Sequence, residues 1–113
     1  MDNPTDHEFE QFKEMKYGVR AAFIILWKYL YRYRLKTVKE IVKRWAPASE
    51  NNVASYVKTV IQSQGLEQNE TLDFENYTQM RLLLRGMCLA ENGQYIADSD
   101  IQEGYDLAVK TLT

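Results

Sequence analysis

Cysteine and histidine are nearly absent from the 113-residue sequence, which has one of each, Cys88 and His7. A single cysteine cannot form an internal disulfide and offers no thiolate cluster to a metal ion. A lone histidine without a second metal-binding side chain at ligand spacing is a poor metal site. The five glycines are dispersed, which excludes a glycine-rich phosphate loop. We therefore expect no metal and no cofactor.

Long hydrophobic runs are also missing. The longest, from Ala21 to Trp27, is far too short to span a bilayer. The first 18 residues hold no apolar run of the kind that forms the core of a signal peptide. We expect no signal peptide and no membrane insertion.

Charge is segregated along the chain, although the net charge is only −2. Residues 13–44 contain ten Lys or Arg and two acidic residues, a net charge of +8. Residues 1–12 are acidic, and residues 45–113 carry four basic and ten acidic residues. The two halves could pair with each other, or the basic half could form a positive face for an anionic partner.

Apolar spacing predicts one compact all-α domain of five helices over residues 13–113, preceded by an acidic arm over residues 1–12. The first helix is expected over 16–34, the second from Thr37 to about residue 45 and the third over 52–64. A fourth is expected to end near Glu91, and a fifth follows it. The aromatic alternation over 27–33 would also suit a strand, but the periodic stretch is longer than a typical strand.

Capping residues predict where several of these helices begin and end. Thr37 and Glu40 form a capping box. Gly65 ends the third helix, and Asn92-Gly93 ends the fourth. The expected N-caps of the last two helices are polar residues ahead of each apolar stripe: Thr71 or Asp73, and Asp98, Ser99 or Asp100. Gly104, inside the last helix, predicts close packing against another helix.

The stretch from Arg44 to Tyr56 holds the densest run of unusual residues. Pro47 stops the preceding helix, while Ser49, Asn51 and Asn52 are N-cap residues. One interpretation is a capped structural corner. The other is a ligand groove floored by the Trp45 ring, for which the candidate binding residues are Arg44, Trp45, Asn51, Asn52 and Tyr56.

Two carboxylates are the candidate catalytic residues, Glu91 and Glu50. Glu91 continues the apolar face formed by Met80, Leu84 and Met87, and a carboxyl group there needs a partner or a raised pKa. A glycosidase of the lysozyme type uses such a glutamate as its general acid, with a second carboxylate nearby. The alternative is that Glu91 is structural and binds a buried arginine, Arg20 or Arg44.

Nucleic-acid binding is the weakest of the alternatives. Lys28, Arg32 and Arg34 interleave with tyrosines, a pattern that can bind single strands, but a helix distributes these residues around its circumference. The linker from Ala46 to Asn52 is too long for a helix-turn-helix. The tyrosines are therefore expected in the core, with the basic residues facing solvent.

The chain resembles a phage and prophage family described as virion or structural protein. The resemblance lies in the pattern Thr-Val-x-x-Ile-x-x-Arg-Trp-Ala-Pro-x-x-Glu-Asn, here Thr37, Val38, Ile41, Arg44, Trp45, Ala46, Pro47, Glu50 and Asn51. Supporting positions are Phe12, Gly18, Arg20, Ala21, Tyr33, Glu91, Asn92, Gly93, Gly104 and Ala108. Two features differ: the family's N-terminal Arg-Asn-Asn-Asn-Pro-Gly-Asn-Ile segment has no counterpart, and Arg34 stands where a glycine is usual.

This resemblance implies a phage or prophage protein, with a lysozyme-like helical fold as the analogous shape. We expect a virion-associated or structural protein that acts as a non-catalytic interaction domain, in the bacterial cytoplasm or on the virion. Its expected partners are other phage or virion proteins. The enzymatic alternative is a peptidoglycan glycosidase, of lysozyme or lytic transglycosylase type, with cell-wall glycan as its ligand. The second alternative is a nucleic-acid-binding helical domain.

Overall fold

The computed structural model describes residues 15–45 and 50–113. Over these residues the fold is all-α, which confirms the predicted class. Its five helices are α2 (Met15–Tyr31), α3 (Val38–Trp45), α4 (Glu50–Gln64), α5 (Tyr77–Asn92) and α6 (Asp98–Leu112). The predicted arm, residues 1–12, lies outside the described residues. None of the described helices is long and apolar enough to cross a membrane.

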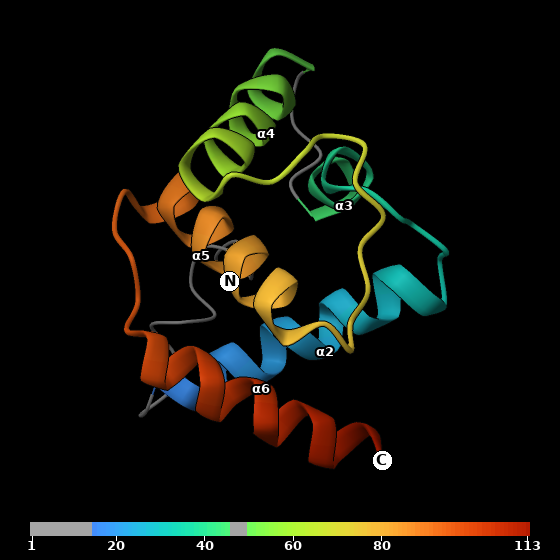
Figure 1. Ribbon diagram of the computed structural model, residues 1–113, viewed down its shortest axis with the longest axis vertical. Coiled ribbons are helices and arrows are strands. Elements are labelled where there is room, and N and C mark those ends of the chain that lie inside the picture. Colours follow the sequence, from blue (N-terminus) through green and yellow to red (C-terminus); the bar gives the residue numbers. More distant parts are fainter. Residues whose placement is uncertain (1–14, 46–49) are drawn as a thin grey trace, which may run out of the picture.

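The helices form two closely packed pairs joined into one core. α2 lies alongside α6, and α4 lies alongside α5, while α3 contacts both α4 and α2 (Figure 1). α2 contributes the apolar stripe that its spacing predicts, with Val19, Phe23, Leu26 and Leu30 buried. Its other apolar side chains, such as Ile24 and Ile25, are partly buried against the same core, which explains why this helix is apolar on several sides.

α2 ends three residues earlier than predicted because the backbone reverses at Arg34. Arg34 has a φ of 58°, in the left-handed region, and Leu35 N–H donates to Tyr29 O at 2.9 Å. Tyr33 therefore lies beyond the helix and is 51% exposed, instead of joining the predicted stripe. Arg34 occupies a backbone conformation that glycine adopts without the steric penalty of a Cβ.

The cap of α3 agrees with its prediction. Glu40 N–H donates to Thr37 Oγ1 at 3.3 Å, and Glu40 Oε1 accepts from the backbone N–H groups of Lys36 (2.7 Å) and Thr37 (3.2 Å). These bonds, that from Lys36 first, lower the pKa of the Glu40 carboxyl below its ordinary value. Gly65 and Gly93, at φ +71° and +70°, end α4 and α5 as expected.

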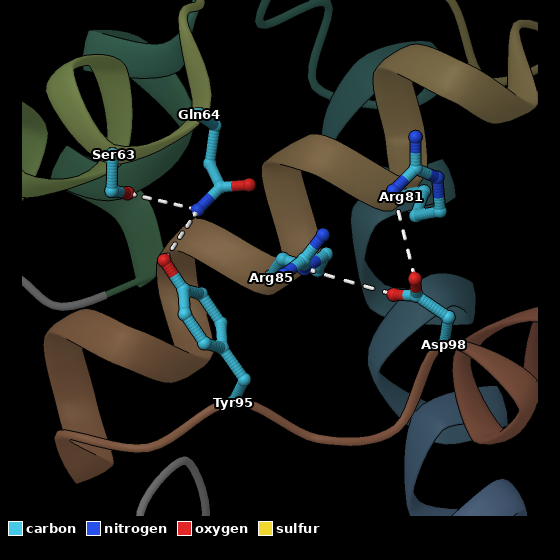
Figure 2. A network of polar contacts seen from close by, with 6 residues as sticks. All are labelled: Ser63, Gln64, Arg81, Arg85, Tyr95 and Asp98. Carbon is cyan, nitrogen blue, oxygen red and sulfur yellow. Dashed lines mark hydrogen bonds and ion pairs between the residues drawn. The ribbon is translucent and has the colours of Figure 1, made fainter.

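The N-caps predicted for α5 and α6 are wrong. Asn76 caps α5, and its side chain accepts from Gln79 N–H at 3.0 Å, because the preceding segment first turns to bury Leu72 and Phe74. α6 begins after Ala97 without a side-chain cap. The Asp98 carboxylate points instead toward Arg81 (4.0 Å) and Arg85 (3.7 Å) of α5 (Figure 2).

Gly104 allows α2 and α6 to approach each other closely. A Cβ at this position would lie 2.3 Å from Val19 Cγ1 and 2.9 Å from the carbonyl oxygen of Lys16. Such contacts are far inside van der Waals distance, so only a glycine fits here without moving one of the helices. The packing role that was predicted for Gly104 is confirmed.

Gly104→Ala should lower the free energy of unfolding by about 2 kcal/mol, since overpacking outweighs the gain of about 1 kcal/mol in helix propensity. Urea unfolding followed by circular dichroism measures the change. Gln102→Ala, at an exposed position of the same helix, is the matched control and should stay within about 0.5 kcal/mol of wild type. Equal stability of Gly104→Ala and wild type would contradict the close approach.

Arg34→Gly should raise the free energy of unfolding by about 0.5–1 kcal/mol, because it removes the left-handed penalty. Gly65→Ala, at an exposed glycine with no atom within 4 Å of the added Cβ, should lower it by about 1 kcal/mol for the same reason. Arg34→Ala keeps the Cβ and removes the rest of the side chain with its charge, so it should give none of this gain. Equal stabilisation by Arg34→Ala and Arg34→Gly would show that the left-handed backbone is not the cause.

Candidate functional site

The Glu91 carboxylate lies where α3, α4 and α5 meet. Its Oε2 accepts a hydrogen bond from Trp45 Nε1–H, at the end of α3, over 2.8 Å. The same oxygen accepts from the Tyr56 hydroxyl of α4 at 3.1 Å. The Tyr56 oxygen also lies 3.3 Å from the carbonyl oxygen of Met87, and its single hydrogen points best to the nearer, charged acceptor. One carboxylate oxygen thus connects three helices.

Local sequence explains how each of these side chains reaches the site. Met87 and Glu91 are four residues apart on α5 and share a face. Met87 is buried, and Glu91 continues that face where the helix nears the surface. On α4, Tyr56 follows the buried Val53 by one helical turn. Trp45 is 4% exposed, and its ring meets the Tyr29 ring edge-on, with centroids 6.3 Å apart.

The described hydrogen bonds of Glu91 come from residues other than Arg20 and Arg44, the two arginines predicted as its partners. The guanidinium group of Arg44 lies over the Tyr33 ring at 4.4 Å, and that of Arg20 lies 5.3 Å from the Tyr17 ring. The described hydrogen bonds to Glu91 come instead from an indole N–H and a phenol O–H. A buried tryptophan needs an acceptor for its N–H, and this requirement is the sequence feature that could have pointed to Trp45.

The structure brings together only some of the predicted site residues. Trp45, Tyr56 and Glu91 share one hydrogen-bonded cluster, whereas Arg44 is exposed and lies over Tyr33. Asn52 is exposed on α4. The side chains of Glu50 and Asn51 lie outside the described part of the structure, so the role predicted for Glu50 as a second carboxylate remains a prediction.

Cys88 is buried immediately beside this cluster. Burial, together with the negative charge of Glu91, raises the pKa of its thiol to about 12. The thiol is therefore protonated at neutral pH, and it lacks the thiolate character that a nucleophile needs. Within residues 15–45 and 50–113 no group of His, Cys, Asp and Glu side chains could hold a metal ion.

A groove of about 460 Å³ lies on another part of the molecule, between α2 and α6. We call it the α2–α6 groove; it is lined by Trp27, Tyr31, Phe74, Glu75, Tyr105, Asp106, Val109, Leu112 and Thr113. No pattern in the sequence predicted this groove. The sequence feature that could have indicated it is the pair Trp27 and Tyr31, which lie four residues apart on α2. Their ring centroids are 5.6 Å apart.

The two charged halves of the chain pack against each other where α2 lies alongside α6, but no ion pair between described residues joins them. Leu72 N–H donates to Lys36 O at 2.8 Å, and the Tyr31 hydroxyl donates to Asp73 at 3.3 Å. The ion pairs between described residues are those of Arg81 and Arg85 with Asp98, all in the second half. The basic side chains of residues 28–44 are exposed, as expected for a positive face.

Comparison with known proteins gives one informative similarity. The chain is 34% identical over 103 residues to Protein P5 of Pseudoalteromonas phage PM2. The aligned region covers 89% of this chain and 62% of Protein P5, so the chain spans about three fifths of that protein's length. No protein-family model matches the chain, and no solved structure matches it. The chain therefore has a phage homologue, while the predicted motif family and lysozyme-like fold remain predictions.

Glu91→Gln should lower the free energy of unfolding by about 1–3 kcal/mol, because hydrogen bonds to a charged acceptor are replaced by weaker, neutral ones. Urea unfolding at neutral pH measures the change. Glu103→Gln, at an exposed site of α6, is the matched control and should stay within about 0.5 kcal/mol of wild type. If Glu91→Gln is as stable as wild type or more stable, the carboxylate does not contribute to the free energy of unfolding. That result would be expected of an active-site residue.

Proposed function

We propose that this chain is a phage- or prophage-derived, virion-associated protein that acts as a non-catalytic interaction domain. Its phage homologue supports the origin. Glu91 is the residue that the sequence predicts as the general acid. The hydrogen bonds that its carboxylate accepts support the non-catalytic role. Its partners would be other proteins of the same phage particle.

The observation that carries this proposal is the pair of donors on Glu91 Oε2. Two hydrogen bonds received by one carboxylate oxygen favour the ionised form. A general acid of the lysozyme type must hold a proton that it gives to the leaving group. The two donors also come from different helices, so the carboxylate stabilises the junction of α3, α4 and α5.

The second candidate is a peptidoglycan glycosidase of lysozyme or lytic transglycosylase type, with Glu91 as its acid. A specific observation favours it: a half-buried carboxyl group at the end of a helix lies against an indole and a phenol. This reaction would need Glu91 to be protonated, and it would need a second carboxylate or a bound water opposite the sugar. Glu50 is the predicted second carboxylate.

Digestion of purified peptidoglycan separates the two candidates. We expect the purified chain to release no more soluble muropeptides than the buffer blank. The assay covers roughly pH 4 to pH 8, because a carboxyl group with a raised pKa would act as an acid within this range. Egg-white lysozyme serves as the positive control on the same substrate. Release at an ordinary enzymatic rate, abolished by Glu91→Gln under conditions where circular dichroism shows that variant folded, would establish the glycosidase instead.

Particles from the host that encodes the chain test the virion-associated role. We expect density-gradient-purified particles to contain the chain in a constant ratio to the major coat protein across the particle peak. Mass spectrometry of the gradient fractions measures that ratio. A chain that stays with the soluble host proteins and is absent from the particle peak would contradict virion association.

A further inference from the structure

The α2–α6 groove has an apolar floor and an acidic rim. Trp27, Val109 and Leu112 are partly buried against the core, whereas Glu75 and Asp106 are exposed at its edge. No lysine or arginine is among its lining residues. Aromatic faces and carboxylates both attract cations, and an apolar floor accommodates an aliphatic stem. The groove therefore fits a lysine or arginine side chain.

Two cations that fit the groove lie next to it, on α2 and in the turn that follows. Lys28 lies on α2 directly after Trp27, and Arg32 is the first residue after the helix, directly after Tyr31. The backbone N–H of Arg32 still donates to Lys28 O at 2.8 Å, so Lys28 and Arg32 are spaced like neighbours on a helix face. We call Lys28 and Arg32 the basic row. Both side chains are exposed, and the ion pairs between described residues involve neither of them.

We propose that a second copy of this chain docks on this face, with the basic row of each copy in the α2–α6 groove of the other. A two-fold interface needs one self-complementary patch, in which a surface and its complement lie side by side on the same molecule. The groove and the basic row adjoin along α2 and carry opposite charges, which meets that need. The remaining basic residues of 28–44 add attraction toward the partner's acidic rim.

This interface is separate from the Glu91 cluster. It involves α2, α6 and the turn before α5, whereas Glu91 joins α3, α4 and α5. Self-association is therefore independent of whether the chain is catalytic, and either proposal can fail without the other.

Charge-reversal variants examined by sedimentation velocity and equilibrium test the interface. The acid-reversed variant is Glu75→Lys with Asp106→Lys, and the base-reversed variant is Lys28→Glu with Arg32→Glu. Wild type should form a dimer whose dissociation constant rises with salt. Each variant alone should dimerise at least about tenfold more weakly, because like charges then face each other across the interface.

An equimolar mixture of the two reversed variants should restore dimers, now as heterodimers, because opposite charges face each other again at both contacts. Lys58→Glu and Glu103→Lys, exposed on α4 and α6 outside the groove lining, are the control reversals and should dimerise like wild type. Circular dichroism melting checks that every variant is folded.

Several results would overturn the proposal. They are a wild-type chain that stays monomeric at every concentration reached, reversed variants that associate like wild type, and a mixture that does not form heterodimers. A monomeric wild-type chain that binds an arginine-rich peptide, with binding lost in the acid-reversed variant, would assign the groove to a basic segment of a foreign protein instead.

Discussion

The Glu91 carboxylate is the group on which the arrangement of the central helices depends. A charge of this kind is costly to place among apolar side chains unless donors replace the lost water. Trp45 and Tyr56 provide those donors from two other helices. In return, the carboxylate accepts from a buried indole N–H, which would otherwise lack a partner. The carboxylate and the two donors thus satisfy each other's hydrogen bonding, and their bonds hold α3 and α4 against α5.

The same interaction determines how the molecule is interpreted functionally. A carboxyl group at the end of an apolar helix face is the sequence pattern expected of the general acid of a lysozyme-type enzyme. In the structure, Glu91 Oε2 accepts hydrogen bonds from Trp45 and Tyr56. The phage homologue indicates where the protein comes from, but its name, Protein P5, states no activity. The proposed non-catalytic role thus depends on the geometry of one carboxylate oxygen, and the proposed self-association depends on a different face.

Much of the fold could be predicted because periodic burial and caps are local properties. The stripe of α2, the Thr37–Glu40 box and the glycine ends of α4 and α5 all follow from residues within a few positions of each other. The N-caps of α5 and α6 could not be predicted in this way. Asp73 and Asp98 are good capping residues, but the first bonds Tyr31 and the second faces Arg81 and Arg85, and these partners are distant in sequence.

The site was predicted in part for the same reason. The position of Glu91 on the Met87 face followed from helical spacing, whereas its partners depended on how three helices pack. Arg44 and Arg20 were reasonable by charge, but they lie over tyrosine rings. The α2–α6 groove is formed by residues from α2, the turn before α5 and α6. No local pattern places these residues together.

A double-mutant cycle between Tyr56 and Glu91 tests directly whether the Glu91 carboxylate holds neighbouring helices together. Tyr56→Phe removes only the hydroxyl and Glu91→Met removes the acceptor, so the coupling free energy of the two substitutions reports the hydrogen bond between them rather than packing. We expect a coupling free energy of about 1 kcal/mol in urea unfolding. Additive effects of the two substitutions, with no coupling beyond about 0.3 kcal/mol, would show that the bond between Tyr56 and Glu91 does not hold α4 against α5.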